Sequence, residues 1–544
     1  MSKFLTPDVY TEEVPFLPQS VAQVSTAVPA FIGFTEKATK DGESVKNRAV
    51  RVATLLEFKE IFGEAQSASF DVIVNDDNVV TNVDVNSLQH TLYYALELYF
   101  KNGGGDCYIV SVGNYSDTYN AQAFSAGLEA VSREDEPTLI MLGEATNLSK
   151  DDYAQVCQEA LRQCQDLKDR FCIFDIQRND NGGQDFRNTI GTGNLKYGAA
   201  YTPFLQTSLN YRYVGADVKI SNSSSESSIQ FEVDDSIKIT YSGSIQDAPE
   251  FKINKGTASS AISFSITDAT LTIANVGEGK PASEIISAWN AFTEKGNFDI
   301  VALNSATLVQ SKTTTALTTS GGGVAALTLS DIKVSHSELY NRVVTELAKQ
   351  RIILPPSAAI AGAYATTDRE RGVWKAPANV SLSGVIGPVE KITSKDQESL
   401  NVDATSGKSI NAIRSFVGKG TMVWGARTLA GNDNEWRYVS VRRLFNMIEE
   451  STKKASQFAV FESNDAVTWL KVKAMIESFL YGVWQQGGLA GATEEQAYFV
   501  NIGLGKTMTP QDVLEGRMIA EIGLAAVRPA EFIVLKFSHK LQEA

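Results

Sequence analysis

The sequence predicts a multi-domain α/β protein with a β-rich insertion and an extended arm at each end. The chain has 544 residues, too many for one ordinary core, because domains cluster at about 100–150 residues. Strand and helix patterns alternate over residues 25–205, whereas Ser/Thr-rich strand patterns fill residues 206–330. A helical pattern returns over residues 331–515. We therefore expect an α/β core assembled from N- and C-terminal parts and interrupted by the insertion.

Residues 1–24 are expected to form an extended arm. Prolines break this stretch into short extended runs, and no candidate partner strand lies nearby in the sequence. Such a segment fits pairing with something distant or external better than folding by itself. The residues expected to make this link are Val9, Tyr10 and Glu12.

The α/β domain is predicted from three buried strands separated by two helices. The strands are expected at 107–112, 138–142 and 171–176, with helices at 121–131 and 151–167. Apolar runs of four to six residues indicate buried strands, and apolar residues at helical spacing indicate the helices. Strand, helix, strand, helix, strand implies a parallel sheet.

The insertion is predicted from alternating apolar and polar residues. Residues 237–241 and 270–274 alternate in this way, and serine dominates residues 221–228. A period of two indicates half-exposed strands. We expect residues 206–330 to form a β-rich domain that projects outward.

The last third of the chain predicts two amphipathic helices and a terminal pair of strands. Residues 441–451 carry one apolar helical face, and residues 469–483 carry a second. Strands are expected at 516–527 and 531–537, joined by a turn at 528–530. Residues 516–544 are therefore assigned to C-terminal strands and a second linking arm, whose linking residues are Phe532, Ile533, Val534 and Leu535.

Charge and hydropathy exclude two classes of protein. There are 49 basic and 64 acidic side chains, a formal charge of −15, so the chain lacks the Lys/Arg surface that releases counterions from a phosphate backbone. The start has no basic region followed by an apolar stretch, and no window of about 18 apolar residues occurs. We expect a protein made in a cytoplasm, with no nucleic-acid partner and no direct membrane insertion.

The four cysteines predict buried thiols. They are too few for a disulfide scaffold and lie within apolar patterns. Cys157 and Cys164 could face the same way on one helix, which leaves a metal site or a disulfide as the alternative.

No complete catalytic motif occurs in the chain. The three histidines are widely separated, and HExxH, GxSxG and CxxC patterns are absent. Gly505–Thr507 resembles the end of a phosphate-binding loop, but Val500 stands where that loop needs a glycine. In Gly191–Gly193, the third glycine of a dinucleotide motif is replaced by Lys196. We expect no enzyme, no cofactor and no metal.

Asp175 is the strongest single candidate for a functional carboxylate. It stands near the end of a predicted buried strand, where α/β enzymes keep such groups. No histidine or second carboxylate can be assigned as its partner, so a polar strand end beside a solvated loop at 179–183 is the favoured interpretation.

Several segments resemble the contractile tail sheath proteins of phages, R-type pyocins and phage-like contractile injection systems. The N-terminal start is similar to that of the family, with Asp8 in place of the usual glycine. The other matching segments cover roughly the last 180 residues of the chain. The segments are Pro7–Glu13, Asp368–Asn379, Trp424–Thr428, Arg437–Phe445, Phe458–Asp465 and Gly516–Val534.

The resemblance implies a structural subunit. Proteins of this family polymerise as stacked hexameric rings around an inner tube, between baseplate and terminal cap proteins, and contract to drive the tube through a target envelope. Their terminal arms add strands to sheets of neighbouring subunits, which agrees with the unpaired strand patterns at both ends. The alternatives are a cytoplasmic α/β enzyme with a substrate-binding insertion and a surface adhesin.

Lys453 and Lys454 are the tube-facing candidates. They form one of the few paired basic sites in an acidic chain, just past the helix expected at 441–451. Exposed charge pairs, worth about 0.2–1 kcal/mol each, suit a grip that must be released. The alternative is that both lysines complement the carboxyl end of the helix.

Overall fold

The structure of the chain, a computed structural model, describes residues 21–535 apart from residues 76, 87, 223–228, 242–248, 258, 268 and 317–326. The chain divides into two compact units. The first contains residues 1–66, 89–210 and 351–544, and the second contains residues 67–88 and 211–350. The predicted arm residues Val9, Tyr10 and Glu12 lie outside the described residues.

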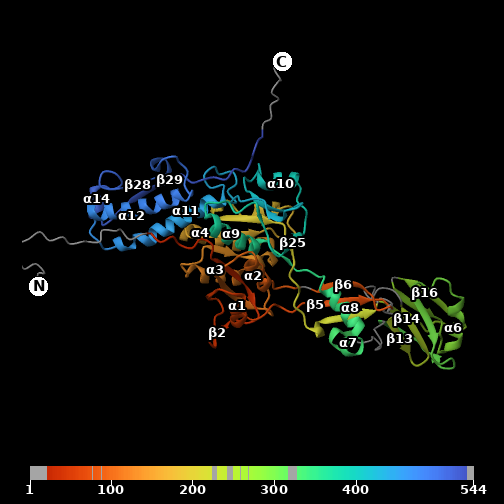
Figure 1. Cartoon of the computed structure of the whole chain (residues 1–544). Coiled ribbons are helices and arrows are strands. Elements are labelled where there is room, and N and C mark those ends of the chain that lie inside the picture. The colour runs from red at the N-terminus through yellow and green to blue at the C-terminus, as the bar shows by residue number, and fades with distance from the viewer. Residues whose placement is uncertain are drawn as a thin grey trace, which may run out of the picture. The chain divides into compact units, whose positions relative to one another are not determined.

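A nine-stranded sheet forms the core of the first unit (Figure 1). Its strands are β1 (Pro29–Thr35), β4 (Ala49–Val52), β7 (Cys107–Asn114), β8 (Leu139–Met141), β9 (Phe171–Asp175), β10 (Gly198–Thr202), β24 (Val380–Ser381), β26 (Ile410–Phe416) and β27 (Gly420–Val423). Their order is β24-β27-β26-β10-β9-β8-β1-β7-β4. The strands from β26 to β7 run parallel, and the edge pairs are antiparallel.

The pairing of β10 with β26 joins the two halves of the chain. Ala200, Tyr201 and Thr202 lie in parallel register with Ile410, Asn411 and Ala412. The insertion therefore separates neighbouring strands of one sheet, and the predicted α/β core built from N- and C-terminal parts is confirmed.

Helices cover both faces of this sheet. Along β1, alternate side chains point to opposite faces: Ile32 packs in the cluster that contains α3 (Ala121–Ser132) and α4 (Lys150–Leu167). Phe31 lies edge-on to Tyr99 of α2 (Leu92–Lys101), with 5.3 Å between ring centroids. The other helix on that face is α9 (Ser357–Arg371), which packs against α2.

A second apolar cluster of the first unit contains α11 (Val439–Ala455), α12 (Ala466–Gln485), β28 (Tyr498–Ile502) and β29 (Ala520–Leu524) (Figure 1). The strand expected at 516–527 is β29. The strand expected at 531–537 is wrong for 531–535, which form no strand. A strand needs a hydrogen-bonded neighbour, and none of the described strands pairs with this stretch.

The second unit contains two apolar clusters. One is a sheet of β5 (Ser69–Val74), β6 (Val80–Asn86), β12 (Val218–Asn222) and β22 (Leu327–Thr328), packed with α7 (Leu329–Ser335) and α8 (Ser337–Leu347). The other surrounds buried Trp289 of α6 (Ala282–Ala291). Its strands are β13 (Ile229–Val233), β14 (Ile237–Tyr241), β15 (Glu250–Ile253), β16 (Ser263–Thr267), β17 (Thr270–Ala274), β19 (Phe298–Ala302) and β21 (Lys312–Ala316).

The division of the chain differs from the boundaries expected at 206 and 330. Residues 67–88 and 331–350 belong to the second unit. The cause is the parallel pairing of β5 with β12, together with α7 and α8, which bury Ile332, Leu339 and Val343 in the same cluster.

Candidate assembly site

The C-terminal segment is fastened to the first unit at Glu531. The Arg427 guanidinium donates two hydrogen bonds to the Glu531 carboxylate, from Nε to Oε1 at 2.8 Å and from Nη2 to Oε2 at 2.5 Å. The Tyr438 hydroxyl donates to the same carboxylate at 3.3 Å. The Arg427 side chain is 4% exposed and the Glu531 side chain 22%. A bidentate pair fixes orientation as well as distance, so the body of the unit sets the position of residue 531.

The four predicted linking residues follow this contact directly. Phe532, Ile533, Val534 and Leu535 are 73%, 79%, 77% and 71% exposed. In Figure 1 this segment passes α10 (Ser394–Asn401) before it leaves the unit. Residues 529–533 also form one wall of a cavity of about 560 Å³ that is lined by Trp424 and Arg414. A contiguous exposed apolar run of this kind is typical of a surface that another chain covers.

The N-terminal segment is fastened in a similar way along α11. The backbone N–H of Val24 donates to Ser451 Oγ at 3.1 Å. The Thr26 hydroxyl donates to Asp368 Oδ2 at 2.6 Å, and Arg443 Nη2 donates to the Thr26 carbonyl at 2.8 Å. Arg443 also binds Asp368 with two hydrogen bonds, of 3.0 and 2.5 Å. Both of these side chains are buried, at 3% and 6% exposed.

A small sheet next to these exits has open edges. β28 and β29 pair only with each other among the described strands, and Phe499 of β28 is 49% exposed. Edge strands present unpaired backbone N–H and C=O groups to any further strand. The sheet can therefore accept an added strand from another chain.

Lys453 and Lys454 lie in the last turn of α11 and not beyond it, which corrects the expected helix end. Lys454 Nζ lies 2.7 Å from Asp135 Oδ2 and 3.3 Å from Glu450 Oε1, while Lys453 Nζ lies 3.1 Å from Glu450 Oε2. The side chain of Lys453 is 63% exposed and that of Lys454 36%. Lys454 thus ties α11 to the loop before β8, and Lys453 is the freer cation.

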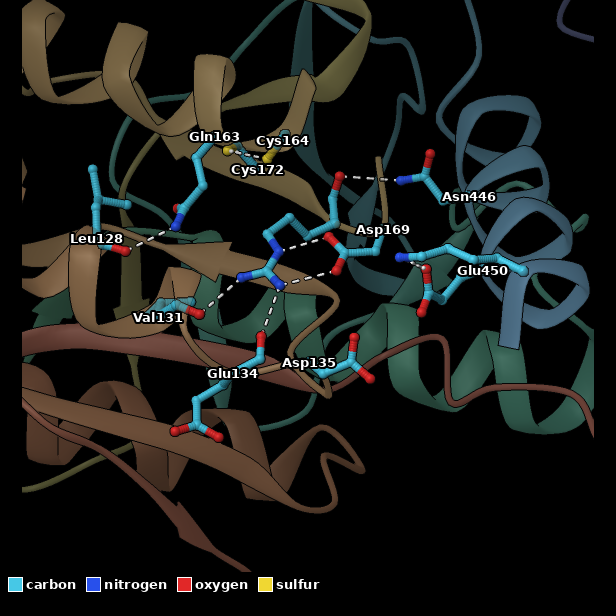
Figure 2. A network of polar contacts seen from close by, with 12 residues as sticks. Leu128, Val131, Glu134, Asp135, Gln163, Cys164, Asp169, Cys172, Asn446 and Glu450 are labelled. Carbon is cyan, nitrogen blue, oxygen red and sulfur yellow. Dashed lines mark hydrogen bonds and ion pairs between the residues drawn. The ribbon is translucent and has the colours of Figure 1, made fainter. Parts of the chain in front are cut away.

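A buried polar network joins α3, β9 and α11 beside these lysines (Figure 2). Arg170 is 1% exposed and donates to both oxygens of Asp169, at 2.7 and 3.0 Å. Its guanidinium also donates to the carbonyls of Val131 at 3.0 Å and Glu134 at 2.9 Å. The side chain of Asn446 donates to the Arg170 carbonyl at 3.1 Å. Each nitrogen of the Arg170 guanidinium therefore donates at least one hydrogen bond, as a buried cation requires.

Asp175 is buried at the end of β9, at 1% exposed, whereas Asn179, Asn181 and Gly182 in the loop that follows are exposed. Its Oδ1 accepts a hydrogen bond of 2.7 Å from the N–H of Ser357, the first residue of α9. Burial raises the pKa of Asp175 to about 7. Glu144 behaves alike: its carboxylate accepts from the N–H groups of Thr91 and Leu92 at the start of α2, and burial raises its pKa to about 7. Both carboxylates cap helices that pack on the sheet.

All four cysteines are buried free thiols, as predicted. The thiol that lies close to Cys164 is that of Cys172, with 3.3 Å between the sulfur atoms, and not that of Cys157 (Figure 2).

An exposed apolar surface that no sequence pattern predicted lies at the start of α12. We call it the α12 patch, and it consists of Val460, Phe461, Val467 and Leu470, which are 61%, 103%, 58% and 66% exposed. Phe461 has a φ of +70°, a conformation in which a bulky side chain is rare. One sequence feature could have predicted this patch. A surface helix is usually apolar along one stripe only, but the apolar residues of the helix expected at 469–483 extend beyond one face.

Within the ranges that the structure describes, no three His, Cys, Asp or Glu side chains lie together as metal ligands would. No helix in those ranges is both long and apolar enough to cross a membrane.

Two family models match the C-terminal half of the chain. The model described as the phage tail sheath protein central domain matches residues 281–429, and the one described as the phage tail sheath C-terminal domain matches residues 431–540. The tail sheath protein of Vibrio phage KVP40 is 27% identical over 185 residues, which are 34% of this chain. That match spans only about a quarter, 26%, of the length of the phage protein.

Two solved structures extend the similarity over the whole chain. The sheath complex of the extracellular contractile injection system PVC, in its contracted state, is 27% identical, covers 99% of both chains and has a TM-score of 0.57. The helical sheath of the anti-feeding prophage in its contracted state is 26% identical. It covers 99% of this chain and 100% of the other, with a TM-score of 0.57.

Proposed function

Because this chain belongs to the family of contractile tail sheath proteins, we propose that it is a structural sheath subunit of a phage tail or phage tail-like particle. It polymerises as stacked hexameric rings around an inner tube and contracts to drive the tube through a target envelope. Assembly takes place in the cytoplasm, together with the tube, baseplate and terminal cap proteins. The role is mechanical and not enzymatic.

The observation that carries this proposal is the exposed run Phe532–Leu535 directly after the fastened Glu531. An exposed apolar run is a liability unless another chain covers it. The open edges of β28 and β29 offer such cover on a neighbouring copy. Because a head-to-tail contact of this kind does not close on itself, it generates a helical array.

Electron microscopy of two chains tests the proposal. The full chain should form long hollow cylinders. A chain that ends after Glu531 keeps the contact with Arg427 but loses the linking residues, so it should remain a folded monomer by size-exclusion chromatography and form no cylinders. Cylinders of normal length from the shortened chain would contradict the linking role of Phe532–Leu535.

For the tube contact we propose Lys453 ahead of Lys454, because Lys453 is the more exposed of the two. Lys453→Glu should reduce the fraction of extended sheaths that retain a tube, while contracted sheaths still form. Lys454→Gln is the matched control for loss of a cation from the same helix turn. Equal tube retention in Lys453→Glu and the wild type would remove this residue from the interface.

We propose that the α12 patch is covered by a second copy of the chain in the polymer, because its four apolar side chains are exposed together and such a patch is typical of a surface that another chain covers. Phe461→Gly should stabilise the monomer by about 1 kcal/mol, since glycine accepts positive φ without the steric cost that a side chain has there. The same variant should polymerise more weakly, measured as a higher critical concentration for cylinders. A variant that is stabilised yet polymerises normally would exclude the patch from the contact.

A further inference from the structure

The two chain exits use the same device, a buried arginine paired with a carboxylate. At the C-terminal exit, Arg427 in the body holds Glu531 on the departing segment. At the N-terminal exit, Arg443 of α11 and Asp368 of α9 bind each other, and together they hold Thr26 by its carbonyl and its hydroxyl. We call these contacts the C-clamp (Arg427–Glu531) and the N-clamp (Arg443–Asp368–Thr26).

The C-clamp lies where the packed body ends. At the N-terminal exit the chain keeps contacts beyond Thr26, since Val24 donates to Ser451 and Val21 packs against the cluster of α11 and α12. Three residues beyond Glu531, Val534 is 77% exposed. On the other side, Val28 is buried at 6% exposed, whereas Gln23 is largely exposed. Apolar packing alone would weaken gradually along a segment that leaves the body of the subunit. The bidentate pair at Glu531 instead fixes one point on the C-terminal segment, and the Arg443–Asp368 pair fixes Thr26 on the N-terminal segment through two hydrogen bonds.

The body sides of the clamps belong to rigid elements. Asp368 and Arg443 lie on two long helices, and the Arg443 guanidinium also stacks over Tyr364 with 4.7 Å to the ring centroid. Arg427 donates a further hydrogen bond to the Asn401 carbonyl at the end of α10, at 3.1 Å. Force applied to either departing segment is therefore passed to helices that pack in the core.

The clamp residues also lie in four of the segments that carry the family resemblance. Asp368 opens the 368–379 segment, Arg427 lies in the 424–428 segment, and Arg443 and Glu531 lie in the 437–445 and 516–534 segments. Each of the resembling segments named here supplies one half of a clamp. These segments therefore share one structural role, which is to hold the chain at the points where it leaves the body.

We propose that the N-clamp and the C-clamp are positioning residues that fix where the two linking arms leave the subunit and keep the arms from peeling off the body when subunits repack during contraction. This inference rests on the proposed function, since it requires that the arms join neighbouring copies. An arm anchored at one point samples a smaller volume, which raises its effective concentration at the neighbouring sheet.

The first experiment asks whether the clamps fix the exits in the full chain. Thr26→Val removes one hydroxyl from the N-clamp, and Glu531→Gln removes the charge of the C-clamp at nearly constant shape. Hydrogen exchange followed by mass spectrometry should show at least tenfold faster exchange over residues 21–28 or 526–535 respectively, and unchanged exchange in β9. Glu129→Gln, which breaks the exposed Arg133–Glu129 pair on α3, is the control and should change neither peptide.

The second experiment measures assembly and contraction of the same variants by electron microscopy. Clamp variants should give shorter cylinders, and contraction should break several-fold more of them than of the wild type. The charge-swapped double variant Arg427→Glu with Glu531→Arg should recover part of the length. Wild-type protein that forms no cylinders would overturn the proposed function. Wild-type cylinders together with clamp variants that assemble and contract intact, or clamp variants with unchanged exchange, would overturn this inference alone.

Discussion

In the first unit, charged side chains are buried throughout the packed body, whereas in the second unit the interior is almost entirely apolar. As whole residues, Arg170, Arg427 and Arg443 are each 3% exposed or less, and so are Glu144 and Asp175. Among the described residues of the second unit, Ser236 is the one buried polar side chain. Its outer cluster instead packs aromatic and aliphatic groups around Trp289.

This difference separates two ways of building a unit. Apolar packing stabilises any arrangement that excludes water. It also tolerates the replacement of one apolar side chain by another of similar volume. Buried ion pairs contribute little net stability but are costly to break, so they select one arrangement among many. The first unit, which carries both chain exits, uses buried ion pairs. Substitutions in the two units should therefore differ in their effects.

Arg170→Leu should have the largest effect. It leaves Asp169 and the carbonyls of Val131 and Glu134 without their donor in the interior, and breaking a buried pair in this way costs about 3–5 kcal/mol. Chemical denaturation followed by hydrogen exchange should show the loss in peptides of the first unit alone. Equal destabilisation of the peptides around Trp289 would show that the two units unfold together.

The pH dependence should come next and should again concern only the first unit. The pKa of Asp175 is raised to about 7 in the folded chain, so the folded state holds a proton that the unfolded state releases near pH 4. The stabilisation is complete below pH 4 and is lost as the pH rises to 7. Asp175→Asn cannot ionise, so relative to wild type it should gain on the order of 1–3 kcal/mol between pH 4 and pH 7. A pH-independent difference between the two proteins would contradict burial of the charge.

Ile239→Val should have a modest effect, confined to the second unit. Ile239 is fully buried in β14 among apolar neighbours, and removing one methylene group from such a site costs about 0.5–1.5 kcal/mol. Peptides of the first unit should keep wild-type exchange, and cylinders should form normally. Loss of assembly would show that the second unit takes part in the subunit contacts.

Excision of residues 223–326 should have the smallest effect on the first unit. β12 and β22 are antiparallel neighbours, with Ile220 opposite Leu327, so a short turn can join them directly. The unfolding free energy of the first unit should change by less than about 0.5 kcal/mol, as expected for sites that share no partners. Sheaths should still form. A shortened chain that cannot polymerise would contradict the expectation that the insertion projects outward.

Local patterns sufficed for several features of the fold and the site. The buried strand at 171–176, the helices at 121–131 and 151–167 and the burial of the four thiols follow from hydrophobic spacing, which depends on neighbours along the chain. The apolar run Phe532–Leu535 was identifiable for the same reason. In contrast, the burial of Asp175 depends on α9, which begins 182 residues later, and no local pattern shows such a cover.

Local patterns predict an acidic α/β chain with a β-rich insertion, an extended segment at each end and segments that resemble one structural family, because periodicity, charge and turn residues act over short distances. The fold sets the pairing of β5 with β12, which places residues 67–88 in the second unit. It also determines that Asp368 meets Arg443 and that Arg427 meets Glu531, 104 residues away. These partners are chosen by the packing of the helices and strands that carry them, since a charged residue matches many opposite charges in the sequence and only the fold brings one of them within hydrogen-bonding distance.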